Sequence, residues 1–175
     1  MWQSGRIAYA NVPPTAAEID KLTEDVRYER LMFDLTSEWC RAERRKSAAS
    51  DGFVMAEAIM RSNAYLEALI IHTRNLYDFF KSTIPKDKTG TRIHDDVFAV
   101  DFVSDWQAPS KAMATLRELI QSTNKRTHHI TAYRQRVPKT DDSKQLEEIY
   151  SIVADLWDQF LRRTSVRHRR ALRID

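Results

Sequence analysis

The segment TNKRTHHITAY, residues 123–133, places an amide, two strong cations and two adjacent histidines within a sequence of helical spacing. Lys125 beside His129 is expected to disfavour the protonated imidazole, and a neutral imidazole flanked by cations suits chemistry at a phosphate. On a helical projection His129 shares the more exposed side with Lys125, whereas His128 lies with Asn124 near the core edge. A structural role for His128 and a basic, solvated helix face are the alternative interpretations.

A second polar group, Arg74, Asn75 and Asp78, lies within LIIHTRNLYDFF, residues 69–80. Arg74 and Asp78 are four residues apart, so they can form an ion pair along one helix, and such pairs are common. A guanidinium group is equally suited to hold the oxygens of a phosphate. The spacing alone leaves a structural ion pair and a functional cation as open alternatives.

Acidic residues gather in HDDVFAVDFVSD, residues 94–105, where Asp101 and Asp105 share a helical face as a divalent-cation site would require. Helix capping by Asp95 or Asp96 explains the same residues more simply. The sequence has no glycine-rich phosphate loop, no zinc-type Cys/His spacing and no HExxH motif. We therefore expect neither a metal nor a cofactor.

Few residues interrupt the elements that must position these side chains. The 175 residues are 42% apolar and include only three Gly and five Pro, which is enough apolar content for one domain with long helices. Apolar residues recur every three or four positions and do not alternate. We predict an all-α, up-and-down bundle of four long helices plus one short helix, with an N-terminal arm (1–14) and a basic tail (162–175).

The first helix is expected to begin after Thr15, which would form a capping box with Glu18, and to end in SAASDG at 47–52. Further helices are expected at about 52–83, at 95–103, from Pro109 onward, and after residue 143. The positions predicted to face the core are Ile19, Leu22, Val26, Phe33 and Cys40; Met55, Ile59, Ser62, Leu66, Leu69, Thr73, Leu76, Tyr77 and Phe80; Met113, Leu116, Ile120, Thr123, Thr127 and Thr131; and Leu146, Ile149, Val153, Leu156 and Phe160. Three tryptophans are also expected there: Trp39, Trp106 and Trp157.

The predicted second helix carries a second stripe on its other side: Ala64, Ala68, Ile71, Asn75 and Phe79. A helix that is apolar on two sides needs two partners. The second partner is either another helix of the same bundle or the same helix of a second subunit about a two-fold axis.

The formal charge is +3, and residues 162–175 carry six Arg against one Asp. Such a tail can bind phosphates by releasing counterions, or can be a frayed, solvated terminus. The single cysteine, Cys40, rules out an internal disulfide framework, and no apolar run has the length of a signal sequence or membrane span. We expect a cytoplasmic protein with no membrane association.

Three blocks in this order, IHTRNLYDFF (71–80), DDVFAVDF (95–102) and NKRTHHIT (124–131), resemble the HEPN superfamily of helical nucleotide-binding domains, in particular its abortive-infection-U-like branch. The resemblance implies a helical bundle, commonly a homodimer, with a polar cleft at the subunit interface. Many members of the superfamily are metal-independent ribonucleases of defence or toxin-antitoxin systems. An RNA substrate and an antitoxin partner are therefore also implied, with the homodimer formed through the face at 64–79.

By the same resemblance Arg74 and Asn75 match the arginine-polar pair of these enzymes, which steadies the phosphate charge. The later block places Asn124, Lys125, His129 and Thr131 in the site, with Asp78 and His128 as further supporting residues. The histidine expected four to six residues after the arginine is missing, because 79–81 are Phe, Phe and Lys. His129 supplies this function from the neighbouring helix, or the domain only binds RNA. A non-enzymatic module that binds proteins is the other reading.

Overall fold

The computed structural model describes residues 14–86, 88, 96–127 and 142–174. Within these ranges every regular element is a helix, so the all-α prediction is confirmed for the described chain. The helices are α1 (Ala16–Ala48), α2 (Gly52–Phe79), α3 (Ala99–Phe102), α4 (Ser110–Thr127), α6 (Asp142–Arg163) and α7 (Val166–Leu172). Only α1 and α2 are long, with 33 and 28 residues, whereas α6 has 22 and α4 has 18. The described helices thus include two long ones, where four were predicted.

The helix α1 begins as the sequence predicts. Thr15 is the N-cap and forms a capping box with Glu18, whose backbone N–H donates to the threonine hydroxyl at 3.3 Å. Hydrogen bonds from the backbone N–H and the hydroxyl of Thr15 lower the pKa of Glu18. A positive φ of 53° at Gly52, tolerated because glycine lacks Cβ, turns the chain back into α2.

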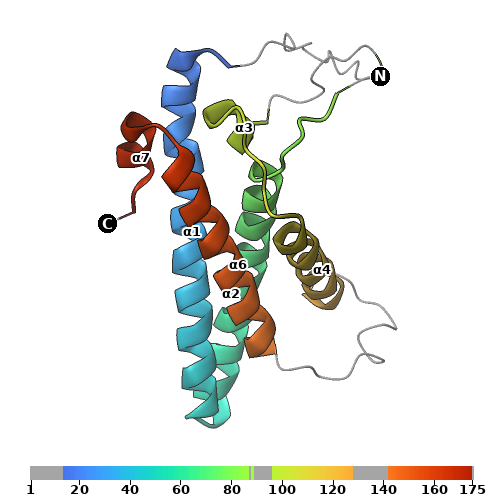
Figure 1. Cartoon of the computed structure of the whole chain (residues 1–175). Helices are drawn as coiled ribbons and strands as arrows, with labels where there is room; N and C mark the ends of the chain where they lie inside the picture. The colour runs from blue at the N-terminus through green and yellow to red at the C-terminus, as the bar shows by residue number, and fades with distance from the viewer. Residues whose placement is uncertain (1–13, 87, 89–95, 128–141, 175) are drawn as a thin grey trace, which may run out of the picture.

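The helices α1 and α2 lie side by side in opposite directions, and α6 packs along both of them (Figure 1). Two contacts show that α6 runs in the opposite direction to α1. Arg41 pairs with Glu147, and Phe33, earlier in α1, stacks on Tyr150, later in α6. In the same figure α4 crosses on the α2 side of the bundle, and α7 lies beside α1. The two helices on the flanks are therefore separated by the central three.

An aromatic cluster closes the end of the bundle where α2 ends. Phe160 is fully buried there and has ring contacts with Phe79, Phe80 and Trp106. The indole N–H of Trp106 donates to the Phe80 carbonyl oxygen at 2.9 Å, which satisfies a carbonyl at the end of α2. This contact fixes the segment that leads into α4.

Most of the predicted core positions are buried. All five predicted residues of α6 are buried, as are Leu116, Ile120 and Thr123 in α4 and Val26, Phe33 and Cys40 in α1. Met55 and Ile59 are exposed instead, because the first turns of α2 lie beside α1 but extend beyond α4 and α6 (Figure 1). Trp106 and Trp157 are buried as expected, but Trp39 is 41% exposed.

Two finer predictions are wrong or incomplete. Neither Asp95 nor Asp96 is the N-cap of α3; that residue is Phe98, whose N–H donates to Asp101. Of the second stripe on α2, Phe79 is buried in the aromatic cluster, whereas Ala64, Ile71 and Asn75 are exposed.

None of the described helices combines the length and apolarity that crossing a bilayer requires.

Candidate functional site

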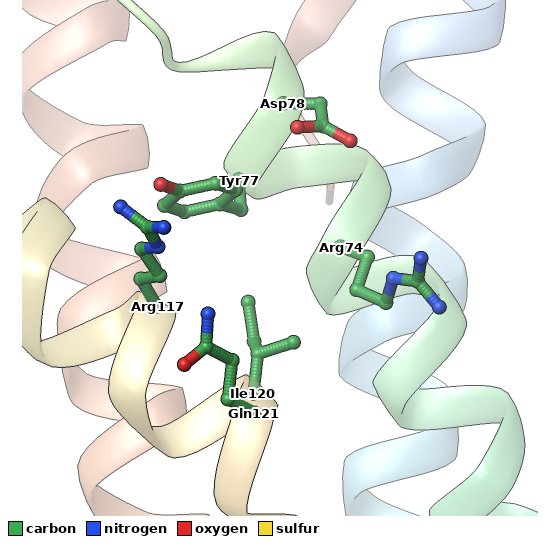
Figure 2. Close-up of a pocket in the computed structure, with 6 residues that line it drawn as sticks. All are labelled: Arg74, Tyr77, Asp78, Arg117, Ile120 and Gln121. Atoms are coloured by element: carbon green, nitrogen blue, oxygen red, sulfur yellow. The ribbon is translucent and has the colours of Figure 1, made fainter. Parts of the chain in front are cut away.

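A small pocket of about 200 Å³ lies where α2 and α4 meet. Its lining residues come from equivalent positions of the two helices, at i, i+3 and i+4: Arg74, Tyr77 and Asp78 from α2, and Arg117, Ile120 and Gln121 from α4. Residues with this spacing project from one side of a helix. Each helix therefore contributes one set of mostly polar side chains, and in Figure 2 Tyr77 of α2 extends toward α4, whereas the Arg74 guanidinium and the Asp78 carboxylate extend away from it.

The pocket is held in place by the apolar residues beneath it. Leu76 in α2 and Leu116 in α4 are buried, and Ile120 is both part of the core and the apolar floor of the pocket. Thr73 is buried too, but its hydroxyl donates to the Leu69 carbonyl oxygen at 2.6 Å, so it is not available to a ligand. The polar side chains above this layer are thus supported by a packed interface.

The Arg74–Asp78 ion pair considered from the sequence does not form. Asp78 pairs instead with Lys81, at 2.5 Å between Oδ1 and Nζ. The same Nζ lies 5.3 Å from the ring centroid of Tyr77, which favours this position of the lysine. Lys81 neutralises the carboxylate, so the charge of Arg74 is not offset by its helix neighbour.

Two arginines dominate the electrostatics of the pocket. Arg74 and Arg117 are both exposed, and neither makes an ion pair or a hydrogen bond within the described part of the chain. Figure 2 shows the Tyr77 hydroxyl on the side of Arg117, with the Gln121 amide beside them, whereas the guanidinium of Arg74 extends away from these three groups. Guanidinium, phenol and amide groups together offer hydrogen-bond donors to an oxyanion such as a phosphate.

No imidazole lines this pocket among the described residues. His72 is only two residues from Arg74, but its side chain is 12% exposed and its Nδ1 lies 2.8 Å from Glu29 of α1. Its position near the Tyr28 ring, in an edge-to-face arrangement, also belongs to the α1–α2 contact. His72 therefore has a structural role between the two long helices.

The structure places the predicted site residues unevenly. Arg74 and Asp78 line the pocket, whereas Asn75 is exposed next to them and is not part of the lining. Asn124 and Lys125 belong to α4, one turn after Gln121, although their side chains are outside the described set. Three predicted site residues lie outside the described residues: His128, His129 and Thr131. The core position predicted for Thr131 is therefore outside them too.

Three lining residues were missed: Arg117, Gln121 and Tyr77, the last of which was assigned to the core. Tyr77 is half-buried, so its ring packs while its hydroxyl reaches the pocket. Arg117 and Gln121 follow the buried Leu116 and Ile120 by one position each. Their spacing of four residues was visible in the sequence, but an isolated Arg and Gln on a helix resemble any solvated face.

The acidic residues at 96–105 have structural partners. Asp101 accepts from the Phe98 N–H at 2.9 Å, and Asp105 pairs with Arg163 at 2.7 Å. Among the described residues there is no group of three His, Cys, Asp or Glu side chains that could hold a metal ion. Asp101 and Asp105 are therefore explained by helix capping and by an ion pair, without a metal ion.

The basic tail is not a frayed terminus. Arg162 and Arg163 end α6, and residues 166–172 form α7, whose Leu172 is fully buried. Arg163 and His168 have the spacing of the arginine–histidine motif, but Arg163 is paired with Asp105 and His168 Nε2 lies 3.1 Å from Asp20. His168 therefore attaches α7 to α1, and Arg163 attaches the end of α6 to the segment after α3.

Ser165, His168 and Asp20 form a hydrogen-bonded chain that has the residue types of a hydrolytic triad. The Ser165 hydroxyl lies 3.2 Å from His168 Nδ1, but it also accepts the His168 N–H and is the N-cap of α7. The chain is thus explained by helix capping and by the contact with α1.

No family model, curated protein or solved structure matches the chain.

Proposed function

We propose that this protein is a HEPN-like domain of a defence or toxin-antitoxin type system that binds RNA in the pocket between α2 and α4. The observation that carries the proposal is the pair of exposed arginines, Arg74 and Arg117, which line one pocket from two helices without carboxylate partners in the described chain. Guanidinium groups bind phosphate oxygens in bidentate geometry and keep their charge at all physiological pH values. The up-and-down arrangement and the resemblance of residues 71–131 belong to the same proposal.

In this proposal the pocket holds one backbone phosphate, and the Tyr77 hydroxyl and the Gln121 amide add neutral hydrogen bonds. The volume of about 200 Å³ suits a phosphate and part of its sugar rather than a whole oligonucleotide. The rest of an RNA strand would then lie across the surface. Phosphate contacts of this kind fix position without reading the base sequence.

Cleavage requires a group that removes the proton of the 2′-hydroxyl, and His129 is the residue proposed for it. The helix α4, which carries Arg117 and Gln121, extends to Thr127, so His129 follows two residues later in the chain. The arginines would stabilise the negative charge that develops on the phosphate. The reaction so proposed uses no metal ion.

The proposed partners are a second copy of the chain, through the face at 64–79, and an antitoxin protein. The exposed positions of Ala64, Ile71 and Asn75 support the first of these, because small and apolar side chains at the surface of a long helix favour helix packing. Asn75 would then lie at the subunit interface, next to Arg74.

The pocket can be tested with the double variant Arg74→Gln, Arg117→Gln and a 5′-labelled single-stranded RNA. We expect the variant to bind at least about tenfold more weakly in fluorescence anisotropy, because hydrogen bonds to charged groups contribute about 1.5–3 kcal/mol each. His129→Ala should abolish cleavage in the presence of a chelator while leaving binding within about twofold, as a general base contributes to the reaction step rather than to affinity.

The matched control is Arg45→Gln, Lys46→Gln, which removes the same charge from the last turn of α1, at the opposite end of α2 from the pocket. Unchanged helicity by circular dichroism confirms that each variant folds. Equal RNA affinity of the pocket variant and the control would refute the assignment of the pocket, and cleavage that survives loss of both Arg74 and His129 would refute the catalytic one.

The second candidate function is a non-enzymatic module that binds other proteins. It is favoured by exposed apolar side chains on the outer side of α2, namely Phe53, Met60 and Ile71. Under this alternative Asn75→Leu changes the assembly state, His129→Ala has little effect, and no RNA is turned over at any protein concentration.

A further inference from the structure

The six arginines of residues 162–173 separate into two groups according to their contacts. Three of them make contacts that fix this end of the chain: Arg163 of α6 pairs with Asp105, Arg167 of α7 pairs with Asp20, and Arg169 of α7 donates to the carbonyl oxygens of Arg162 and Thr164. The other three, Arg162, Arg170 and Arg173, are exposed, and their guanidinium groups have no partner within the described residues. The contacts of Arg163, Arg167 and Arg169 fix α7 and the end of α6. The exposed arginines therefore extend from a fixed backbone.

Contacts with α1 bring further positive charge to this surface. The Arg27 Nε donates to the Arg173 carbonyl oxygen at 3.1 Å, which places this arginine of α1 against the end of α7. Leu172 is fully buried, and His168 contacts both Asp20 and the ring of Phe102. The exposed cations therefore belong to one packed unit of α1, α6 and α7, here called the α7 surface and defined by Arg27, Arg162, Arg170 and Arg173.

The chemistry of the α7 surface favours a phosphodiester backbone over a membrane. All its cations are arginines, which match phosphate geometry and need no apolar anchor. A helix that binds a lipid interface inserts an apolar face, whereas Leu172 is committed to the core, and Val166 is the one large apolar side chain of α7 that is exposed. The carboxylates Asp20 and Asp105 are paired with Arg167 and Arg163. These two carboxylates therefore do not neutralise the exposed arginines.

We infer that the α7 surface is a second RNA-binding surface, which holds the phosphate backbone of single-stranded RNA at a distance from the pocket. This inference rests on the proposed function, because RNA is the polyanion assigned to the pocket. Figure 1 shows α7 beside α1 and α4 on the other side of the bundle, so one short phosphate group cannot occupy both places. A strand bound at both surfaces must pass around the central helices, and it is therefore longer than the few nucleotides that the pocket needs.

The test uses the full chain with Arg162→Gln, Arg170→Gln and Arg173→Gln together, and anisotropy with a labelled single-stranded RNA of 20 nucleotides at several salt concentrations. Each lost phosphate contact lowers the slope of log affinity against log salt by about 0.7 for a single strand, so the triple variant should lose about 2 from the slope. A labelled RNA of four nucleotides cannot contact both surfaces at once, so the triple variant should change its slope less than the slope for the 20-nucleotide RNA.

The charge-matched control is Arg45→Gln, Lys46→Gln, Lys144→Gln, which removes three exposed cations from the other end of the bundle. A slope in the α7 variant equal to that of this control would overturn the inference, even if the pocket variant Arg74→Gln, Arg117→Gln shows that RNA binds there. Loss of binding in the α7 variant with no effect of the pocket variant would refute the pocket and retain the α7 surface. Binding of the wild type to phosphatidylserine vesicles and not to the 20-nucleotide RNA would refute the RNA assignment.

Discussion

Arg30 illustrates how this chain accommodates a charge in its interior. The residue is 7% exposed, and its guanidinium lies 5.4 Å from the ring centroid of Phe33 and 5.8 Å from that of Trp157. Its Nε donates to Asp34 at 3.0 Å, four residues along α1. Burial raises the pKa of Asp34, while the charge of Arg30 and its hydrogen bond act in the opposite direction. Charges at i and i+4 are common on helix surfaces, so this spacing in the sequence does not reveal that the pair is buried.

The Asp34→Asn variant should change how stability depends on pH. A carboxyl group whose pKa is raised in the folded protein stabilises it most below the ordinary value of about 3.9, and this contribution is lost as the pH rises through the folded pKa. The wild type should therefore lose free energy of unfolding relative to Asp34→Asn between pH 4 and pH 7. Urea unfolding of both proteins at each pH measures the difference, and parallel pH profiles would contradict the assignment.

At the scale of the elements, the start of α1 was predictable because its capping box is encoded locally. Thr15 and Glu18 mark the start of α1, and the apolar spacing of α6 identifies all five of its buried residues. The structure of the tail was not predictable, because its anchors, Asp20, Arg27 and Asp105, are distant in sequence from α7. Only part of the pocket lining was predictable, for the same reason. Arg74 lies in one of the three blocks that resemble a known family, whereas Arg117 becomes a candidate only once α4 is seen to pack on α2.

Leu172→Ala should release α7 from the bundle. Leu172 is fully buried, and removing a buried leucine side chain costs about 2–5 kcal/mol. The Asp20 and Arg27 contacts are at the surface and are too weak to hold a seven-residue helix by themselves. Hydrogen exchange should show lost protection at 166–173 with the rest of α1 retained.

Val166→Ala is the matched control for this change, because Val166 lies in the same helix and is 64% exposed. It should leave exchange at 166–173 unaltered. Protection that persists in Leu172→Ala would show that the ion pairs, rather than the apolar anchor, hold α7.

At the scale of the whole molecule, α2 is the element that the pocket and the proposed association of two copies share. One side of it packs in the core, its last turns form a wall of the pocket, and its outer side carries exposed apolar residues. The sequence indicated a helix with two apolar sides, and the structure shows that one of these is open apart from Phe79. Whether a second copy covers this side could not follow from periodicity, which describes a single helix and not its partners.

Ile71→Arg tests the proposed association through the outer side of α2. Ile71 is 51% exposed, so the change should leave the monomer folded. In a symmetric dimer each copy would meet the new charge of the other, and the cost of burying unpaired charges should dissociate it. Sedimentation at several concentrations should show the mass of a dimer for the wild type and of a monomer for the variant; equal masses would contradict the proposal.

The Cys40 thiol can report how often the contact between α1 and α2 opens. Cys40 is the sole cysteine of the chain, is fully buried, and has its Sγ 3.6 Å from the Ser62 carbonyl oxygen of the facing helix. A thiol reagent can modify it only when the two longest helices separate, so the rate of modification reports how often that happens. Slower modification in the presence of RNA would register stabilisation by the ligand without any label or substitution.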